Sequence, residues 1–356
     1  MVIELERVSK TWGKFELKNV ELKIENGDYF IIVGPTGAGK TLLLETIMGF
    51  HRPDEGKIFL DGVNITDAPP EKRNIGYVSQ KCVLFPHMNI RQNIEFGLKM
   101  RGTEKTERNQ IINQILEFTG LEAIQHRRPA TLSGGEKQKV ALARVLATKP
   151  KTILLDEPLT AIDPETAREV KRELKRISRN GITIIHVTHN QVEGFSLGNK
   201  MAVIRSGEIV QVGKPKEIFA NPKTEFVAKF LGYENVFKAQ VVEKQGSFSV
   251  VSVEGVRIKV SEDVNTSECI VAIRPEEINI HFSQIRDNAI NVLKGTIIEF
   301  VDQGPNVSLL VDAGLPFQAL MTKRFFVEKN LEIGQNVWLT FESESVKVIQ
   351  HKWATA

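Results

Sequence analysis

The sequence predicts an α/β protein with a mostly parallel sheet, followed by a smaller all-β domain. Three observations lead to this fold class. A glycine-rich segment, Gly34–Thr41, stands between an apolar strand and a helix. Strands then alternate with helices up to about residue 232, as in a parallel sheet that helices cover on both faces. Beyond that point the helices stop, and short strands bounded by turn residues take over. We therefore predict two domains, 1–232 and 233–356.

The composition is that of an ordinary globular protein. The chain has 356 residues, of which 41% are hydrophobic and 26% charged. Its net charge of +3 is too small to indicate a nucleic-acid partner. No apolar run approaches the roughly 18 residues of a membrane span, and the first residues alternate like a strand rather than a signal peptide. Cys82 and Cys269 form no metal motif, so we expect a reduced cytosolic protein.

The segment after the first apolar strand has the form of a phosphate-binding loop, G-x-x-x-x-G-K-[ST]. Tyr29–Val33 is predicted to be a buried strand, and Thr41–Met48 a helix that ends at Gly49. The glycines allow backbone N–H groups to surround a polyphosphate at the positive end of the helix. We expect Lys40 on the β- and γ-phosphates and the Thr41 hydroxyl on Mg²⁺. The predicted nucleotide-binding residues of the loop are Gly34, Pro35, Thr36, Gly37, Ala38, Gly39, Lys40 and Thr41.

Short antiparallel strands are predicted around this unit. Residues 2–7 and Phe15–Ile24 alternate like paired strands, and a further hairpin turns at Asp61-Gly62. Trp12 lies on the first connection. It is either an aromatic platform on which a nucleotide base stacks or a tryptophan that packs on the surface.

Between about residues 81 and 150 the periodicity is helical, which predicts a helical subdomain. Apolar residues recur at helical spacing from Ile111 to Phe118, with charged residues around them. Just before them lies Val83–Met88, an apolar stretch that contains a proline. This stretch is either local core or an exposed docking surface.

Four polar residues stand at the ends of predicted strands, namely Gln80, Asp156, Glu157 and His189. Ligands of open α/β sheets bind at the carboxyl ends of the strands, and Mg²⁺ prefers oxygen ligands. We therefore expect Asp156 to hold Mg²⁺ together with Thr41, and Gln80 to reach the metal or the attacking water. Glu157 is suited to orient or deprotonate that water. His189 is a candidate for contact with the γ-phosphate, whereas His186 is expected to be structural.

A second helix start has the features of an anion site. Ser133 is a good N-cap, and Gly134 and Gly135 open the helix behind it, which leaves backbone N–H groups accessible. One chain thus carries two predicted phosphate-binding helix starts, in different subdomains.

The second domain contains an internal repeat. Asn235–Glu243 matches Asn291–Glu299 without gaps, and Ser249–Gly255 matches Ser308–Gly314 once a few turn residues are inserted or dropped. The two repeats extend over about 235–282 and 291–350. Duplicated β lobes pack on each other or on a partner's copy, with or without a ligand.

Taken in order, the phosphate loop, Leu132–Glu136, Ile153–Asp163 and His189 resemble the nucleotide-binding subunits of ATP-binding cassette (ABC) transporters. The resemblance covers residues 1 to about 230. It implies a P-loop nucleotide-hydrolase cassette with an antiparallel β subdomain and a helical subdomain, which binds ATP and Mg²⁺ and hydrolyses ATP. It assigns Glu157, His189 and Gln80 to catalysis, and Gln80 also to communication with a membrane partner.

The same resemblance implies a homodimer that holds two nucleotides head to tail. The residues that would contact the nucleotide of the partner subunit are Ser133, Gly134, Gly135, Glu136 and Asp163. A few positions depart from the family pattern without removing a phosphate or metal ligand. They are Glu136, Lys139, Ile162 and Asn190.

Three stretches are similar to the ATPase subunits of molybdate/tungstate importers: Gly34–Glu45, Gly232–Lys238 and Arg274–Glu276. Their oligobinding-type regulatory domain resembles residues 235–349. The implied protein works on the cytoplasmic face of a membrane with two copies of a permease and, indirectly, an extracytoplasmic binding protein. Importers of sulfate, sugar, iron or polyamines are alternatives. A cassette ATPase of translation or DNA repair fits less well, because this chain has one cassette and a β tail.

By the same resemblance, the tail is expected to sense the imported oxyanion. A buried dianion needs backbone N–H groups and a cation or hydroxyl. The candidates are Lys294, Thr322, Lys323 and Arg324, which are alternatively solvated surface residues.

Overall fold

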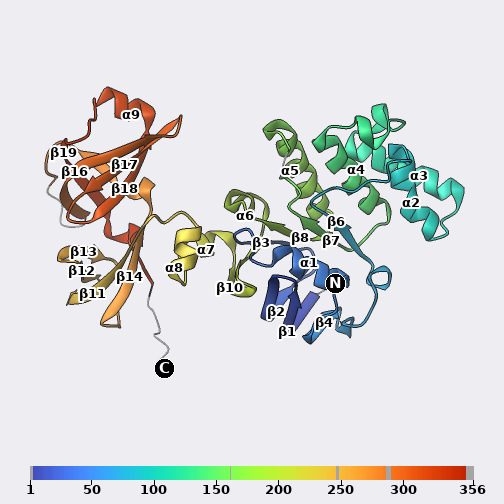
Figure 1. Ribbon diagram of the computed structural model, residues 1–356, viewed down its shortest axis with the longest axis horizontal. Helices are drawn as coiled ribbons and strands as arrows, with labels where there is room; N and C mark the ends of the chain where they lie inside the picture. The colour runs from blue at the N-terminus through green and yellow to red at the C-terminus, as the bar shows by residue number, and fades with distance from the viewer. Residues whose placement is uncertain (1–2, 161, 246–247, 286–289, 350–356) are drawn as a thin grey trace. The chain divides into compact units, whose positions relative to one another are not determined.

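The computed structural model describes residues 3–160, 162–245, 248–285 and 290–349. The chain divides into two compact units, Met1–Lys216 and Glu217–Ala356 (Figure 1). The division precedes the predicted boundary at residue 232, because Arg274 of the tail donates hydrogen bonds to the carbonyls of Leu231 and Phe219. Its guanidinium also lies 4.3 Å from the centre of the Tyr233 ring. Helix α8 (Glu225–Phe230) therefore belongs to the second unit, and α7 (Pro215–Ala220) spans the division.

The first unit is built on a six-stranded sheet in the order β10-β9-β3-β8-β7-β6. Neighbouring strands are parallel except for the β9–β10 hairpin, which confirms the predicted fold class. The strands are β3 (Tyr29–Val33), β6 (Ile75–Val78), β7 (Thr152–Asp156), β8 (Thr183–Thr188), β9 (Lys200–Arg205) and β10 (Glu208–Gly213).

Both faces of the central strand are buried, because its residues alternate between two helices. Phe30 and Ile32 belong to the hydrophobic core that includes Leu43 of α1 (Lys40–Met48). Ile31 and Val33 face α6 (Gln191–Leu197), where a Cβ on Gly194 would meet Val33 at 3.4 Å. This double burial explains why β3 is a continuous apolar run.

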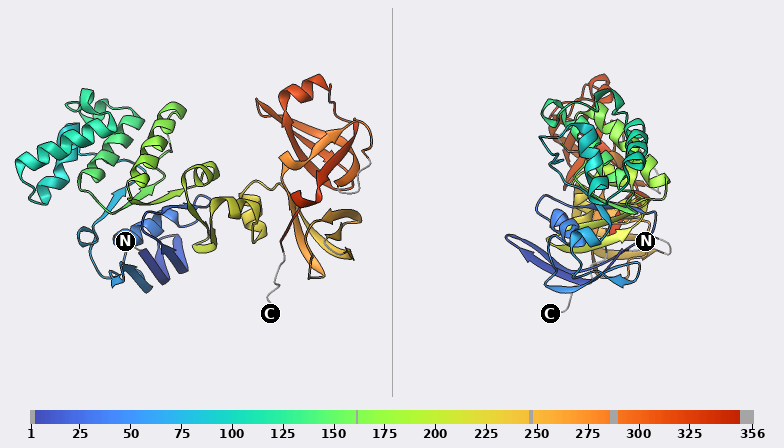
Figure 2. Two further views of the ribbon diagram at one scale, coloured as in Figure 1. Left: turned by 180° about the vertical axis from the view of Figure 1, so that it is seen from behind. Right: turned by 90° about the vertical axis from the view of Figure 1, so that its right-hand side faces the viewer.

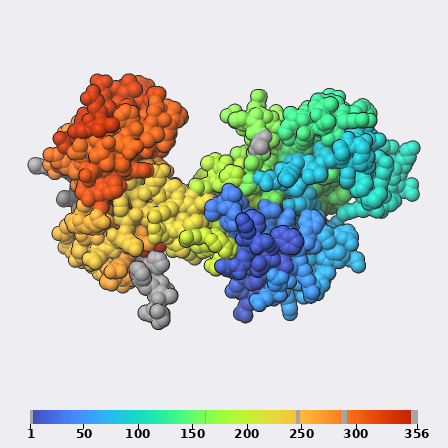
Figure 3. All heavy atoms as spheres, in the orientation of Figure 1, coloured from blue at the N-terminus to red at the C-terminus, as the bar shows by residue number. Residues whose placement is uncertain are grey.

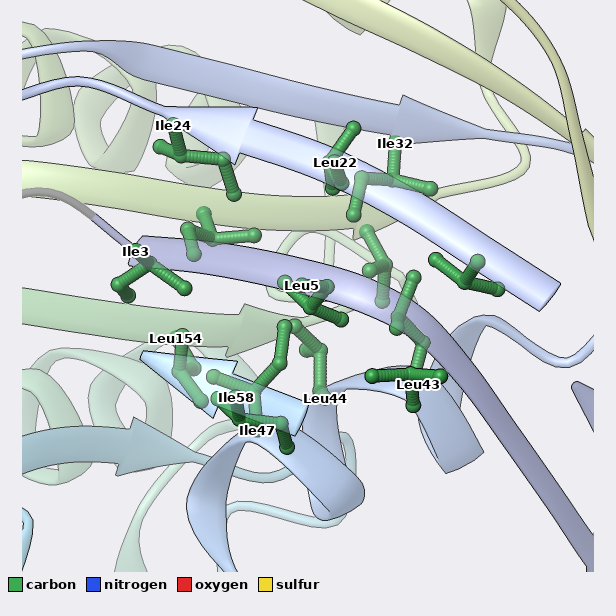
Figure 4. Close-up of a cluster of buried hydrophobic side chains, with 14 of the residues drawn as sticks. Ile3, Leu5, Leu22, Ile24, Ile32, Leu43, Leu44, Ile47, Ile58 and Leu154 are labelled. Carbon is green, nitrogen blue, oxygen red and sulfur yellow. The ribbon is translucent and has the colours of Figure 1, made fainter. Parts of the chain in front are cut away.

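A four-stranded antiparallel sheet has the order β2-β1-β4-β5. It packs on the side of α1 that faces away from the six-stranded sheet. Figure 4 shows side chains of α1, among them Leu44 and Ile47, meeting Leu5 and Ile58 of this sheet. The strands are β1 (Ile3–Trp12), β2 (Phe15–Ile24), β4 (Glu55–Leu60) and β5 (Val63–Asn64).

The helical subdomain follows β6. In Figure 3 its residues, coloured cyan to green, form a lobe beside the strands of the first 60 residues in blue. Its helices are α2 (Ile90–Met100), α3 (Lys105–Thr119) and α4 (Gly134–Ala147). Helix α5 (Pro164–Arg179) packs against α4 through a close contact, since a Cβ on Gly135 would lie 2.1 Å from a methyl carbon of Thr166.

The second unit contains two five-stranded antiparallel sheets, one in each lobe of the β tail (Figure 2). The first sheet has the order β13-β12-β11-β14-β20 and the second the order β15-β19-β16-β17-β18. The strands are β11 (Asn235–Gln245), β12 (Phe248–Val253), β13 (Val256–Val260), β14 (Glu268–Ile273), β15 (Asn279–His281), β16 (Ile290–Asp302), β17 (Asn306–Asp312), β18 (Pro316–Thr322), β19 (Asn336–Glu342) and β20 (Lys347–Ile349).

The two lobes repeat one another but exchange their last strands. Strand β15 follows β14 in the chain yet pairs with β19 of the second sheet, while β20 follows β19 and pairs with β14 of the first. The long strands share a register irregularity at matching places, between Val241 and Glu243 in β11 and between Ile297 and Glu299 in β16.

Two buried asparagines at matching positions fasten the lobes together. Asn235 of the first lobe accepts a hydrogen bond from the Gln318 N–H at 2.6 Å and donates to its carbonyl at 2.9 Å. Asn291 of the second lobe accepts from the Lys259 N–H at 2.7 Å and donates to its carbonyl at 3.0 Å. Each side chain therefore completes the edge strand of the opposite lobe, where backbone groups would otherwise lack partners.

The expectation that helices stop after the first domain is wrong, because α9 (Lys323–Glu328) follows β18. Its N-cap is Thr322, whose hydroxyl accepts a hydrogen bond from the Phe325 N–H at 3.3 Å.

Candidate nucleotide site

The phosphate loop turns the chain from β3 into α1. Gly37 and Gly39 have φ values of +83° and +97°, which glycine adopts at little cost. Gly34 must also be a glycine, because a Cβ there would lie 2.3 Å from the carbonyl oxygen of Ile204. Ala38 is buried and donates its N–H to the Pro35 carbonyl, whereas Thr36 is exposed. The loop therefore presents backbone at the positive end of α1, as an anion site requires.

Lys40 is held within the loop. Its ammonium donates hydrogen bonds to the carbonyls of Gly34 at 2.9 Å and Pro35 at 3.0 Å. Its Nζ also lies 3.9 Å from Glu157 Oε1. Burial lowers the pKa of Lys40, while the Glu157 and Asp156 carboxylates act in the opposite direction.

Thr41 and Asp156 meet at the start of α1. The Thr41 hydroxyl lies 3.1 and 3.2 Å from the two Asp156 carboxylate oxygens. The Tyr77 hydroxyl lies 3.5 Å from Oδ2. Burial raises the pKa of Asp156 to about 6, and the nearby Glu157 and Glu45 carboxylates add to the shift.

The Thr41 hydroxyl and the Asp156 carboxylate are suitable oxygen ligands for Mg²⁺. No group of three or more His, Cys, Asp or Glu side chains is placed to hold a metal within the described ranges. A site of one hydroxyl and one carboxylate is nevertheless suitable for Mg²⁺, which takes one or two protein oxygens and completes its shell with phosphates and water. A carboxylate buried close to other acids is stabilised by such a cation.

Glu157 is held in a fixed orientation by its neighbours. Its φ of +46° is in the left-handed region, which is uncommon for a residue other than glycine, and its N–H donates to the Val187 carbonyl at 3.0 Å. Its Oε2 accepts a hydrogen bond from the Thr160 hydroxyl at 3.1 Å and from Gln80 Nε2 at 3.4 Å. His189 Nδ1 lies 3.1 Å from the same oxygen.

Gln80, Glu157 and His189 are thus brought together, and Lys40 joins them through Glu157. His189 and Gln80 are exposed, so they border the site on its solvent side. His186 is instead buried, with its Nδ1 3.1 Å from the Tyr29 hydroxyl and its Nε2 3.4 Å from Glu193.

The second predicted anion site has its helix start already capped. The Ser133 hydroxyl accepts from the Glu136 N–H at 3.2 Å, and the Glu136 carboxylate accepts from the Ser133 N–H at 2.7 Å. Glu136 also forms an ion pair with Arg127. Asp163 caps α5 by accepting from the Thr166 N–H at 2.9 Å. An anion at α4 would use the N–H groups that the capping box leaves over, on Gly134 and Gly135.

Trp12 stands at the end of β1 and is 56% exposed. Its ring lies against His51, with 4.2 Å between the ring centroids. No sequence pattern pointed to His51.

The four tail residues do not form one site. Lys323 pairs with Asp302 at 2.7 Å, and Arg324 pairs with Glu328 at 2.6 Å. Lys294 is exposed on β16, eight residues before Asp302, which corresponds to roughly 26 Å of extended strand. Thr322 lines a cavity of about 620 Å³, whose other polar side chains are Glu276, Asn279, His281, Ser283 and Lys329.

Besides His51, sequence reasoning missed three supporting residues. Tyr77 and Thr160 contact the two carboxylates, and only their spacing from Gln80 and Glu157 could have indicated them. Arg73 is buried at the other end of α1, where Nη1 donates to the carbonyls of Thr46 and Ile47. A cation at a helix C-terminus neutralises its partial negative charge, so Arg73 stabilises the helix that carries the loop. No local signal marked it.

A buried lysine in a glycine-rich loop, a hydroxyl beside a carboxylate, and a second carboxylate next to them define a phosphate-loop nucleotide site. Comparison with known proteins gives the family. Residues 17–160 match the ABC transporter family model, and residues 271–349 match the TOBE domain. The molybdate/tungstate import ATP-binding protein of Pyrococcus abyssi is 38% identical over 98% of this chain and 100% of its own length. The chain therefore belongs to the ABC transporter family, as an ATPase of that family.

Two further relatives and a solved structure support the same family. The molybdate/tungstate import protein of Thermococcus kodakarensis is 40% identical over 85% of this chain and 90% of its own length. The spermidine/putrescine import protein of Thermotoga maritima is 39% identical over 87% of this chain and 86% of its own. A dimeric ATP-binding cassette solved in a post-hydrolysis state with ADP and Pi has a TM-score of 0.55 and 30% identity, covering 60% of this chain and 98% of that chain.

No helix among the described residues is long and apolar enough to cross a membrane.

Proposed function

We propose that this protein hydrolyses ATP to drive the import of molybdate or tungstate through a separate membrane permease. The observation that supports the substrate is the 38% identity to a molybdate/tungstate import protein over nearly the full length of both chains. The spermidine/putrescine import protein of Nitrosomonas europaea, aligned over the same 98% of this chain, is less similar, with 34% identity. Polyamine import is therefore the second candidate.

The arrangement of the site supports the roles of its residues. Lys40 and the loop N–H groups bind the phosphates, while Thr41 and Asp156, with Gln80 close by, would hold Mg²⁺. Bound Mg²⁺ would neutralise charge that develops on the phosphates. Glu157 would orient the attacking water and accept its proton, since its carboxylate lies 3.9 Å from Lys40 Nζ, the group proposed to bind the phosphates. His189 would contact the γ-phosphate from the solvent side.

The proposed working unit is a homodimer bound to two copies of a permease, on the cytoplasmic face of the membrane. An extracytoplasmic binding protein would act through the permease. Two capped helix starts, at Ser133 and Asp163, lie outside the phosphate loop's own site, and the related ADP-bound cassette is described as a dimer. Ser133, Gly134, Gly135, Glu136 and Asp163 would then contact the nucleotide of the partner subunit.

Substrate-stimulated ATPase activity tests the transport assignment. The protein is purified with its permease, reconstituted into vesicles with the binding protein, and assayed with molybdate, tungstate, sulfate and spermidine. Stimulation by molybdate or tungstate alone is expected. Stimulation by spermidine alone would replace the first candidate with the second.

We also propose that the β tail binds the imported oxyanion. Because Lys323 and Arg324 are paired with acids and Lys294 lies far along β16, the cavity at Thr322 and Lys329 is the better supported place. Inhibition of the reconstituted ATPase by excess tungstate is expected to weaken in Thr322→Val and Lys329→Met, but not in Lys294→Met. Equal inhibition in all three variants would exclude this cavity.

A further inference from the structure

The Trp12–His51 pair lies beside the phosphate loop. Trp12 ends β1 and pairs in register with Phe15, the first residue of β2. The next residues of β2, Glu16 and Leu17, pack so closely on the loop that a Cβ on Gly39 would meet each of them at 3.3 Å. The hairpin that carries Trp12 therefore packs on the loop in which phosphates bind.

His51 is fixed behind Trp12. Its Nε2 lies 3.2 Å from Glu45 Oε2, on the helix that carries Lys40, and its side chain is only 14% exposed. The preceding residue, Phe50, packs edge-on against Tyr77 with ring centroids 5.5 Å apart. The imidazole is thus anchored on both the helix and the chain that follows it, so it presents a constant face to Trp12.

Trp12 contacts the His51 ring and remains largely exposed. Its ring meets His51 at an interplanar angle of 39°, and 56% of the residue stays exposed. More than half of the residue is therefore left for another partner to cover. An exposed aromatic ring stacks with nucleobases, since every base has a π-face.

We infer that His51 is a positioning residue for the nucleobase: it supports one face of Trp12 so that the adenine of ATP stacks on the other. This inference rests on the proposed function, in which Trp12 contacts the base. His51 acts through Trp12. Without it the indole would rotate freely, and ordering the indole on binding would reduce the affinity.

Binding measured with and without a base tests this. The full-length protein is titrated with ATP and with inorganic tripolyphosphate, which has the phosphates but no base. His51→Ala is expected to raise the Kd for ATP about two- to tenfold, the range of an aromatic pair. The Kd for tripolyphosphate and kcat should not change, while KM rises. His51→Phe keeps a ring on Trp12 and should restore most of the affinity, whereas His51→Gln should not.

Tryptophan emission provides a readout that a purely structural role would not alter. The chain has three tryptophans, Trp12, Trp338 and Trp353, so Trp12→Phe identifies the part of the ATP-induced emission change that belongs to Trp12. That part is expected to shrink in His51→Ala and to return in His51→Phe.

The outcomes separate this inference from the proposed function. If Trp12→Ala weakens ATP binding but His51→Ala does not, His51 has no positioning role. If His51→Ala weakens ATP and tripolyphosphate equally, its effect is on the loop and the inference is overturned. If Trp12→Ala leaves the Kd for ATP unchanged, the contact between Trp12 and the base is itself wrong.

Discussion

Asp156 and Glu157 are neighbours in the chain with different surroundings. Asp156 is buried among other acids and has a pKa near 6, whereas Glu157 is surrounded by the donors Gln80, Thr160 and Lys40. Asp156 is therefore suited to bind a cation, and Glu157, which these donors hold in place, to orient a water molecule.

Replacing Glu157 with Gln tests its role as base. The amide has nearly the same shape but accepts no proton, so hydrolysis should fall about 10²–10⁴-fold while ATP still binds. Phosphate release and nucleotide binding are measured on the same preparation. Glu165→Gln, on the exposed first turn of α5, is the matched control and should be near normal. Near-normal turnover in Glu157→Gln would refute the assignment.

The raised pKa of Asp156 predicts that its ionisation destabilises the folded, nucleotide-free protein as the pH rises. Because its folded-state pKa of about 6 exceeds the ordinary 3.8, its contribution to stability is present below pH 4 and lost as the pH rises to 6. Asp156→Asn should therefore raise the free energy of unfolding at pH 7.5 by about 1–3 kcal/mol. A smaller increase, about a third as large, is expected at pH 4.5, where the folded-state carboxyl is still mostly protonated.

Urea unfolding at the two pH values measures this difference. Thermal shifts with and without Mg-ATP provide the control, because Asp156→Asn should lose most of the stabilisation by Mg-ATP. A variant that is equally stabilised at both pH values would show that burial of the charge is not the cause.

The convergence of these residues could be predicted from the sequence, because parallel strands end at one edge of a sheet and Gln80, Asp156 and His189 each lie at or just after the end of such a strand. Arg73 and His51 could not be predicted. Their roles arise from long-range packing against α1, and a lone arginine or histidine has no periodic pattern that would show which carbonyl or ring it meets.

At the scale of elements, the segment after β6 is partly core and partly surface. Phe85 is half-buried and packs on Phe96 with ring centroids 4.5 Å apart, and Leu84 is buried. Val83 is 64% exposed. Part of Val83–Met88 is therefore local core and part is exposed, because the sequence did not show which side chains α2 would cover, and the docking role stays a prediction.

We expect the exposed part of this segment to dock on the permease next to Gln80. Val83→Asp should reduce co-purification and transport while leaving the ATPase activity of the isolated protein intact, because it places a charge on a contact surface but not in the core. Val63→Asp is the matched control, as Val63 is also 64% exposed and lies on β5. Unchanged assembly and transport in Val83→Asp would place the docking site elsewhere.

The paired asparagines predict that the lobes of the tail depend on each other. Asn235→Ala would leave an N–H and a carbonyl of β18 without partners, so the free energy of unfolding should fall by about 2–3 kcal/mol. Urea unfolding measures this loss, and Asn265→Ala on an exposed loop serves as control. A loss no larger than in the control would show that the lobes are held by their apolar core alone.

At the scale of the whole molecule, ATP should close two copies around two nucleotides. In the Glu157→Gln background, the mass in solution is expected to increase on addition of ATP, as measured by light scattering after size exclusion. Ser133→Arg should remove this ATP-dependent increase, because it adds bulk and charge at the start of α4. Thr106→Arg, on the exposed surface of α3, should not. No increase in any variant, with or without the permease, would contradict the dimer.

The exchange of β15 and β20 between the lobes also bears on how the tail can be divided. Neither repeat contains all the strands of one sheet. A protein made from one repeat alone would therefore lack an edge strand of its sheet. Two molecules of a single repeat could complete each other's sheets only by exchanging those strands, as in a domain-swapped dimer. The tail is thus the covalent equivalent of such a pair. A protease cut between the repeats would therefore leave two fragments that remain interlocked, and the same fragments produced separately should reassemble on mixing.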